Sequence, residues 1–504
     1  MVRMDEDLVR PRLSGPPREG RRTLLVCCVA FASMLALVLG LRSNGRNSLW
    51  LDEAVSVRLA QIPWPAFVDM ILGREANSAV YFLLLRGWVG LGGDGEMWVR
   101  SLSALVFAAT VPGLYWLGAQ LGMQRAGVAA ALLFAVSPAG VLGAQEARGF
   151  ALESCLLVFA AVCLVKALAN GGAHQWIAWV LLSILATWVH LLAVLVPISL
   201  VVVIVARRRR ATPHAAVVGI SCVFIGAALV AYAGLRGGQG APGFLVGKTL
   251  ANAVRLPLFL TGGSLALFTW TACAGVASLT LALRARRSQR EPGDWFGIQL
   301  LLAWLILPCA TALLISTRSP IFHTRYFLYE LAPLLLLTSS AVQHLTRRLA
   351  ISFVVVSVLV SGFALRGVYS RPPTADWRAA TQLVEKAGSA EDGIIFNPPF
   401  ERIPFQYYMD ASETSADKYP QPTVPADPWA LLPVEDYATV QQALTDPRAL
   451  FRPGQSVWVV GSGRSEEPDI VSAVSYLNRN ARVTFDTQVP GIRVQRYDLS
   501  GRRR

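Results

Sequence analysis

The sequence predicts a polytopic α-helical membrane protein with a small extracytoplasmic α/β domain at its C-terminal end. Of the 504 residues, 54% are hydrophobic and only 15% are charged, whereas about a quarter of a typical soluble protein is charged. Apolar runs of about 20 residues, each long enough to cross the hydrocarbon core, recur through the first three-quarters of the chain. After residue 370 these runs stop, and shorter strand-like and helix-like patterns follow.

Eleven apolar runs are candidate transmembrane helices. The first follows a basic segment, residues 1–22, and is too long for a typical signal-peptide core. We therefore expect it to be a membrane helix with its basic end in the cytoplasm. The eleven candidate spans are residues 23–41, 98–121, 126–141, 150–169, 174–189, 190–206, 214–234, 263–284, 296–316, 326–343 and 350–366.

The arginines between these runs predict the orientation. They cluster at Arg18/Arg21/Arg22, Arg125, 207–210, 284–290 and Arg347/Arg348. If the further apolar stretch 79–93 does not cross the membrane, every cluster falls on the cytoplasmic side, as the positive-inside rule requires. If it crosses, all clusters except the first lie outside. We therefore expect 79–93 to lie in the outer interface, within a large first outer loop, 42–97.

This orientation divides the chain into three parts and predicts a multi-pass protein of the plasma or inner membrane. A cytoplasmic N-terminus, 1–22, precedes a transmembrane domain, 23–369, and an extracytoplasmic domain, 370–504. In the last part "DWRAATQLVEKAG" indicates an amphipathic helix, and "GIIFNP", "SVWVVGSG", "ARVTFDTQV" and "IRVQRYDL" indicate strands. A further helix is expected around 467–480 and Pro- and Asp-rich loops over 398–435.

Two adjacent acids, Asp52 and Glu53 in "LWLDEA", stand just after the first apolar run. One interpretation is structural, since acids in the first turn of a helix complement its dipole. The other is chemical, because a carboxylate at the bilayer surface can act as a general base toward an acceptor hydroxyl. The spacing alone leaves both interpretations open.

Further polar residues that this topology places on the outer face form a second group. Arg148 with Glu146 in "GAQEARGFAL" is either a membrane anchor or a phosphate-and-carboxylate pair. His190, inside a long apolar run, is either a buried structural histidine or a functional residue at the membrane surface.

The segment "SPIFHTRYFLYELAP" brings His323, Arg325 and Tyr326 to the start of a span. An arginine presents a planar fork that suits a phosphate, and a lipid phosphate would lie at this depth. Lys248, in "LVGKTLAN", is a weaker candidate for contact with lipid phosphate.

Several other functions are not indicated. The seven cysteines all lie in apolar segments and form no metal-binding or disulfide pattern. The net charge of +14 comes mostly from the short clusters between apolar runs, which favours membrane orientation over nucleic-acid binding. No cofactor is required by any motif. A divalent metal at the acid pair is compatible with the residues, but no ligand cluster indicates one.

Four segments in order resemble the GT-C fold, polyprenyl-phosphate-sugar-dependent membrane glycosyltransferases, in particular the bacterial branch related to protein O-mannosyltransferases and aminoarabinose transferases. The segments are "LWLDEA", "GDGEMWVRSLSALVFAATVPGLYWLG", "SPAGVLGAQEARGFAL" and "HTRYFLYELAPLLLL". The resemblance implies that Asp52 is the catalytic carboxylate and Glu53 its neighbour. It also implies that Arg148 and Arg325 lie near the donor phosphate, and we expect His190 and Lys248 to bind that phosphate with them.

The resemblance further implies an inverting transfer of a sugar from a polyprenyl-phosphate donor to an extracytoplasmic hydroxyl on a glycan, lipid or protein. The partners are then the lipid-linked sugar, membrane lipids and this acceptor. Many relatives have a His-Pro-Pro-Leu-Tyr pattern where this chain has "NSAVY", Asn77 to Tyr81. The residues expected to contact substrate are Trp50, Asn77, Tyr81, Glu146, His323 and Tyr326.

Two other classes of protein remain as alternatives. A polytopic lipid or sugar transporter, or flippase, would carry ionisable residues at mid-membrane depth, repeated halves and broken helices. No internal repeat is evident in the sequence. A non-catalytic scaffold would use the outer domain to bind cell-wall polymer.

Overall fold

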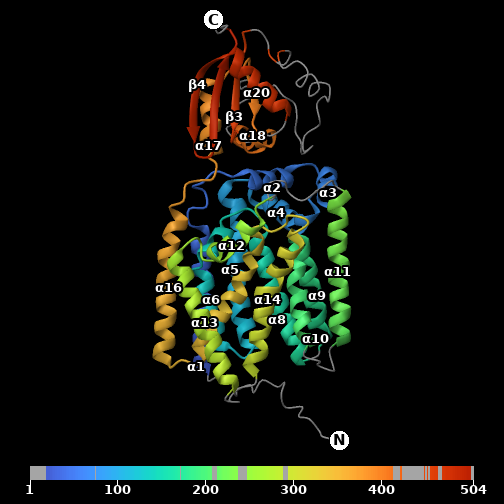
Figure 1. Cartoon of the computed structure of the whole chain (residues 1–504), viewed down its shortest axis with the longest axis vertical. Helices are drawn as coiled ribbons and strands as arrows, with labels where there is room; N and C mark the ends of the chain where they lie inside the picture. Colours follow the sequence, from blue (N-terminus) through green and yellow to red (C-terminus); the bar gives the residue numbers. More distant parts are fainter. Residues whose placement is uncertain are drawn as a thin grey trace. The chain divides into compact units, whose positions relative to one another are not determined.

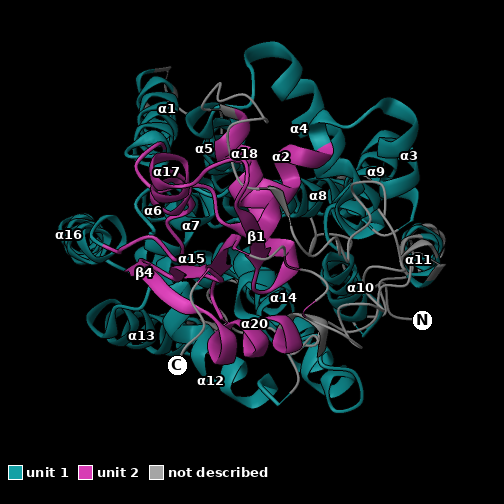
Figure 2. Ribbon diagram, turned by 90° about the horizontal axis from the view of Figure 1, so that it is seen from above, with its two compact units in different colours: residues 1–44, 60–370 teal, residues 45–59, 371–504 magenta. Residues whose placement is uncertain are grey.

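The computed structural model describes residues 19–73, 75–170, 172–206, 213–236, 247–287, 293–411, 421–422, 448, 451, 454–463 and 468–500. Clustering of the chain gives two compact units, coloured in Figure 2. Unit 1 comprises Met1–Asn44 and Ala60–Ser370, and unit 2 comprises Gly45–Leu59 and Arg371–Arg504. The predicted basic cluster 207–210, part of the cluster 284–290 and most of the loops predicted over 398–435 lie outside the described residues.

Unit 1 is built from helices, and Figure 1 shows the long ones, such as α5, α8 and α14, running lengthwise beside one another. Its elements are α1 (Glu19–Leu41), α3 (Trp64–Leu72), η2 (Ala76–Ser78), α4 (Ala79–Gly92), α5 (Glu96–Gln120), α6 (Gln124–Ala135), α7 (Pro138–Ala144), α8 (Phe150–Asn170), α9 (Ala173–Val189), η3 (Leu191–Val194), α10 (Leu195–Ala206), α11 (Pro213–Arg236), α12 (Thr249–Leu260), α13 (Leu265–Arg287), α14 (Gly293–Ser316), η5 (Thr324–Glu330), α15 (Leu331–Ser339), η6 (Ser340–Gln343) and α16 (Arg347–Tyr369). The helix α2 (Leu51–Gln61) begins in unit 2, and its last two residues belong to unit 1.

Six of the helices in the described residues are long and apolar enough to cross a membrane. They are Thr23–Leu41, Glu96–Gln120, Phe150–Ala169, Leu265–Arg284, Trp295–Ser316 and Arg347–Tyr369. The pair α6 and α7, bent by 57°, makes a seventh if the two form one span. The polytopic helical class is therefore confirmed. The total of eleven spans stays a prediction, because the helices at two of the predicted spans, α9 and α10, are apolar but shorter.

Small residues let neighbouring helices of unit 1 approach closely. A Cβ atom on Gly118 of α5 would lie 2.5 Å from the Cα atom of Gly127 in α6, so neither position has room for a side chain. Gly113 of α5 meets Val158 of α8 in the same way, at 2.9 Å. Close backbone approach of this kind is how membrane helices pack, since lipid gives them little hydrophobic driving force to associate. As a result α5 is largely buried among its neighbours.

The loops predicted over 398–435 contain helices, so that prediction is wrong in part. The stretch between the predicted spans 214–234 and 263–284 also contains a helix, α12, in which Leu256 and Leu260 fall one turn apart and are buried despite Pro257 between them. The loops expected over 398–435 begin instead with η7 (Pro399–Glu401) and α18 (Arg402–Ala411). There Phe405, Tyr408 and Met409 recur at helical spacing and are buried.

The helix predicted over 79–93 is present as α4, and it is fastened to the start of α5. The indole N–H of Trp88 donates to the backbone oxygen of Trp98 (2.9 Å), and the indole of Trp98 donates to that of Trp88 (2.8 Å). The two rings stack with centroids 4.6 Å apart. These reciprocal bonds satisfy both indole donors and fix the angle at which α4 meets α5. Its predicted position in the outer interface is a separate matter and stays a prediction.

Unit 2 contains a five-stranded sheet in the order β2-β1-β3-β5-β4. Its strands are β1 (Gly393–Phe396), β2 (Gln421–Pro422), β3 (Ser456–Gly461), β4 (Arg482–Val489) and β5 (Ile492–Asp498). The first three are parallel, while β5 runs antiparallel to both β3 and β4. The four predicted strands correspond to β1, β3, β4 and β5, and the predicted helices to α17 (Trp377–Ala387) and α20 (Pro468–Asn480).

Both faces of this sheet are covered, because neighbouring side chains of a strand point to opposite faces. On β3, Trp458 and Val460 pack with residues of α17 and α18, whereas Val457 and Val459 pack with α20. Strands buried on both faces read as continuous apolar runs, which is why "SVWVV" carries no polar alternation. The edge strand β4 is mostly exposed and more polar.

Candidate functional site

A buried carboxyl–imidazole pair joins two helices of unit 1. The helix α9 ends at Val189, and His190 is extended (φ −159°, ψ 124°) before the chain turns into η3. Its Nδ1 atom lies 3.6 Å from Oε1 of Glu153, in the first turn of α8. Glu153 is wholly buried and His190 nearly so. The break predicted between the spans 174–189 and 190–206 is therefore present as a hinge, and it presents an imidazole to an acid that is shielded from solvent.

Aromatic contacts connect this pair to the segment that contains Arg325. The ring of Tyr326, in η5, lies with its centroid 4.6 Å from that of His190 and 5.3 Å from that of His323. Phe150, at the start of α8, completes the group with centroids 6.2 Å from His190 and 6.1 Å from Tyr326. Tyr326 thus lies between the two histidines, which come from positions 133 residues apart.

Arg325 directly precedes Tyr326 in η5 and is partly exposed. Its backbone N–H donates to Nδ1 of His323 (3.4 Å), the cap residue just before η5. Its guanidinium lies 3.9 Å from the carboxylate of Glu146, and both side chains are partly exposed. Glu146 therefore pairs with Arg325 as well as standing near Arg148 in sequence. A guanidinium has five N–H donors in a planar fork, a geometry that matches carboxylate and phosphate groups.

Asn77 and Tyr81 support the same region from η2 and α4. The backbone N–H of Leu191, directly after His190, donates to Oδ1 of Asn77 (2.6 Å). Tyr81 is buried and packs on Gly149, where an added Cβ would lie 2.6 Å from Val189 and 3.4 Å from Tyr81. An amide oxygen thus fixes the backbone at the hinge, which is a positioning role that needs no titrating group.

The two remaining cations predicted to bind phosphate, Arg148 and Lys248, are in different settings. Arg148 lies in the turn between α7 and α8, where its backbone N–H donates to the backbone carbonyl of Glu146 (2.8 Å) and its own carbonyl accepts from the hydroxyl of Ser103 (3.3 Å). Lys248 precedes α12 and is exposed. The helix α12 contacts the segment before η5 through Asn252, whose amide donates to the carbonyl of Phe322 (3.0 Å). Lys248 is thus connected to the Arg325 segment through one helix.

The acid pair lies in unit 2, where the two carboxyls differ sharply in exposure. Glu53 is wholly buried, and its Oε2 accepts from the backbone N–H of Trp50 (3.3 Å), while its own backbone N–H donates to the carbonyl of Trp50 (3.0 Å). This reciprocal arrangement closes the first turn of α2. Asp52 is partly exposed, and its carbonyl accepts from Ser56. Glu53 is therefore the enclosed member of the pair and Asp52 the more accessible carboxylate, and the catalytic role expected for either stays a prediction.

The segment that precedes the acid pair is bonded to the C-terminal part of unit 2. Ser48 donates to the carbonyl of Ala375 (2.8 Å) and accepts from the backbone N–H of Trp377 (3.1 Å). The backbone N–H of Leu49 donates to the hydroxyl of Tyr408 in α18 (2.6 Å). These bonds explain why residues 45–59 cluster with residues 371–504 although more than 300 positions separate them.

Sequence reasoning missed Glu153 and a second buried acid, Glu330. Glu330 ends η5, is wholly buried, and lies 3.6 Å from the thiol of Cys309. A signal existed, since an ionisable residue inside an apolar run is a candidate for function by default. The missed role of Ser48 had no such signal, because a single serine in a polar loop is unremarkable. Within the described ranges no three His, Cys, Asp or Glu side chains converge as metal ligands, and metal dependence is untested.

Several solved structures share this fold. ArnT from Cupriavidus metallidurans, solved in the apo state and bound to undecaprenyl phosphate, aligns in both forms with a TM-score of 0.56 and 12% identity, over 95% of this chain and 98% of its own. The archaeal oligosaccharyltransferase AglB from Archaeoglobus fulgidus, in complex with an inhibitory peptide and a dolichol-phosphate, aligns with a TM-score of 0.54 and 11% identity. The alignment covers 95% of this chain and 74% of AglB. The mycobacterial arabinofuranosyltransferase AftD aligns with a TM-score of 0.50 and 16% identity, over 95% of this chain and 42% of AftD.

No family model matches the sequence, and no curated protein matches it. At these identities the likeness concerns the fold. The chain therefore has the GT-C fold, a polytopic helical membrane fold, here with a small α/β domain, as the sequence predicted.

Proposed function

We propose that the protein is an inverting glycosyltransferase that moves a sugar from a polyprenyl-phosphate donor to a hydroxyl acceptor outside the cytoplasm. In one displacement, the acceptor oxygen bonds to the anomeric carbon as the bond from that carbon to the phosphate oxygen breaks. The acceptor proton passes to a carboxylate, and polyprenyl phosphate departs. The neighbours ArnT and AglB, with bound undecaprenyl phosphate and dolichol-phosphate in their structures, support a donor of this class.

One observation carries this proposal: the convergence of Arg325, His190 and Tyr326 beside two carboxyls, Glu146 and Glu153. A departing phosphate gains negative charge in the transition state, and prearranged donors at that point stabilise it. Arg325 supplies a planar fork toward the phosphate and His190 a second N–H donor. Arg148 and Lys248, from the neighbouring turn and helix, add positive charge.

Asp52 is the proposed general base, and Glu53 holds the backbone that presents it. Burial and the bond from Trp50 commit Glu53 to closing the first turn of α2, so it is poorly placed to exchange protons with a substrate. Asp52 is next to it and partly exposed. We propose that Trp50, Asn77, Tyr81, His323 and Tyr326 shape the site around the sugar and the acceptor.

The test compares Asp52→Asn with Asp69→Asn in transfer from a purified lipid-linked donor. Asp69 is an exposed acid in the same predicted outer loop, so it controls for removal of one charge. Loss of a general base lowers the rate by about 10²–10⁴-fold. We expect that loss for Asp52→Asn and an unchanged rate for Asp69→Asn, with both proteins equally folded. Full transfer by Asp52→Asn would exclude the mechanism.

The rival proposal, a lipid or sugar transporter, makes a different prediction for the same variants. A transporter would move the lipid-linked sugar across a vesicle membrane without forming a new glycosidic bond. Product analysis by mass spectrometry separates the two, because only a transferase releases free polyprenyl phosphate together with a glycosylated acceptor. The anomeric configuration of that product, measured by NMR, tests the inverting mechanism.

The extracytoplasmic location of unit 2 is also a proposal. A cysteine at the exposed position Glu391 should react with an impermeant thiol reagent applied to intact cells, in a variant that lacks the native cysteines. A cysteine at Arg348, in the first turn of α16, should be protected until the membrane is opened. The reverse pattern would show that the predicted orientation is wrong.

A further inference from the structure

A groove of about 490 Å³ lies between α1, α6 and α16 of unit 1, away from the candidate site. Its volume is within the range of about 300–1,000 Å³ that is typical of small-molecule sites. The walls are aliphatic, with side chains such as Leu25, Val128 and Val354. At the end where α6 and α16 begin, the lining becomes basic, with Arg125 and Arg347.

Positive charge accumulates at this end without compensation from the groove itself. No acidic residue lines the groove. In the part of the chain that the structure describes, neither Arg125 nor Arg347 has a hydrogen-bond or ion-pair partner, and both are exposed. Each stands in the first turn of its helix, where the helix dipole adds further positive potential. The cap residues Met123 and Thr346 give no side-chain hydrogen bond to these helix starts, so backbone N–H donors remain for an anion.

We propose that this groove binds an anionic phospholipid of the surrounding membrane, with its phosphate between Arg125 and Arg347 and an acyl chain along the aliphatic walls. An apolar groove that ends in two unpaired guanidiniums matches a ligand with an anionic head and an apolar tail. Basic pockets between membrane helices are known to hold such headgroups. A soluble anion would not need the aliphatic walls, and a neutral lipid would not need the arginines.

The chain path separates this lipid from the proposed donor. The α6–α7 pair runs from Arg125 to the turn that contains Glu146, and α15 lies between Arg325 and Arg347. The α6–α7 pair and α15 each have one end at the groove and the other end at the candidate site. The groove and the candidate site therefore lie at opposite ends of the helices of unit 1. The bound phospholipid would be a structural partner of the bundle and not the substrate.

The test is native mass spectrometry of the purified full-length protein in detergent, titrated with dioleoylphosphatidylglycerol or dioleoylphosphatidylcholine. The key comparison is Arg347→Gln against Arg348→Gln. The two arginines are adjacent and exposed, but only Arg347 lines the groove. We expect tighter binding of the anionic lipid to the wild type, about fivefold weaker binding to Arg347→Gln and to Arg125→Gln, and no change for Arg348→Gln.

Two further measurements test the apolar part of the proposal. Val128→Phe, which fills the groove, should weaken binding of the anionic lipid while leaving both arginines in place. Soluble glycerol phosphate should fail to displace the lipid. The proposal is overturned if the wild type binds both lipids equally, if Arg347→Gln and Arg348→Gln weaken binding alike, or if glycerol phosphate competes.

Discussion

Two contacts between an acidic and a basic side chain, one in each unit, show how little distance alone says about the importance of a pair. In unit 2, Asp486 and Arg493 lie 2.6 Å apart, but their side chains are 39% and 58% exposed. In unit 1, Glu153 and His190 are 3.6 Å apart, with exposures of 0% and 9%. Water screens the closer pair and would solvate either partner alone, whereas the buried partners have no such substitute. We therefore expect the longer contact to matter more.

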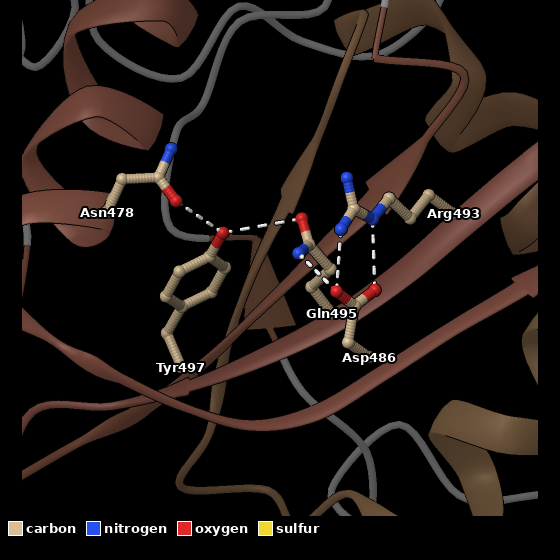
Figure 3. Close-up of polar contacts among 5 residues, drawn as sticks. All are labelled: Asn478, Asp486, Arg493, Gln495 and Tyr497. Atoms are coloured by element: carbon tan, nitrogen blue, oxygen red, sulfur yellow. Dashed lines mark hydrogen bonds and ion pairs between the residues drawn. The ribbon is translucent and has the colours of Figure 1, made fainter.

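Figure 3 shows the exposed example in detail. Asp486 on β4 accepts from Nε and Nη2 of Arg493 at 2.9 and 2.6 Å, and from Gln495 at 3.1 Å. Nearby, Tyr497 donates to Asn478 of α20 at 2.8 Å. Hydrogen bonds from Arg493 hold the pKa of Asp486 below its usual range. Such cross-strand pairs align the edge of the sheet but contribute little free energy each.

The largest effect on folding is expected from Glu153→Ala. This change leaves His190 buried without its carboxyl partner, and breaking a buried pair costs about 3–5 kcal/mol when it is ionised. Denaturant unfolding of the purified protein in detergent micelles measures the change. Glu153→Gln keeps a hydrogen-bonding group of the same shape and should retain more of the stability. A cost below about 1 kcal/mol for Glu153→Ala would show that burial does not strengthen this contact.

The next prediction concerns Arg325 and Glu146, a pair of intermediate exposure, where a substitution should change the transfer rate but hardly the stability. Arg325→Gln should lower the transfer rate by about 10²–10³-fold, as expected for loss of one donor to transition-state charge. Its effect on unfolding should stay below about 1 kcal/mol, since the pair is partly exposed. The exposed Arg318, just before this segment, provides a control as Arg318→Gln. Equal loss of activity in both variants would remove Arg325 from the proposed site.

A smaller effect is expected from Glu53→Gln. The substitution keeps the shape and an acceptor oxygen, but it replaces a charge-assisted bond to the backbone N–H of Trp50 with a neutral one. We expect a loss of about 1 kcal/mol in stability, within the range for a buried hydrogen bond. Transfer should fall far less than for Asp52→Asn. If Glu53→Gln abolishes transfer in a fully folded protein, the roles of the two acids are reversed.

The smallest effect is expected from Asp486→Asn, at most about 1 kcal/mol near neutral pH. Because the folded-state pKa of Asp486 is lowered, its contribution is present above the ordinary pKa of 3.8 and is lost as pH falls through the folded-state value. The difference between variant and wild type should therefore shrink below about pH 4. Hydrogen exchange of peptides from β4 and β5, corrected for intrinsic rates, measures this stability difference as a function of pH. A difference that does not change with pH would contradict the prediction.

The sequence predicts the helices and strands well because each has a clear period or a long apolar run. It fails where a local pattern is ambiguous. Pro257 and Arg255 interrupt the apolar run of α12, and the aromatic residues of α18 stand between proline-rich stretches. In both cases burial against the rest of the unit outweighs the local signals, and only the folded structure reveals that burial.

The candidate site was predictable residue by residue but not as an arrangement. Arg325, His190, His323 and Tyr326 were each recognisable as polar residues at apolar boundaries. Their mutual contacts were not, since nothing local in a sequence specifies which of many such residues meet. Glu153 is the clearest omission, because it lies in the first turn of α8, only five residues after Arg148, which was already a candidate.

The bonds of Ser48 have a consequence for how this protein can be recombined with its relatives. An exchange of residues 371–504 between two such chains would follow the apparent domain boundary, yet it would leave the segment 45–59 with its old host. Ser48 and its two partners, the carbonyl of Ala375 and the backbone N–H of Trp377, would then come from different parent proteins. A chimera that also carries residues 45–59 keeps the acid pair with the domain on which it folded. The part to be exchanged therefore consists of two separate segments, 45–59 and 371–504, and we expect specificity to transfer only when both are exchanged together.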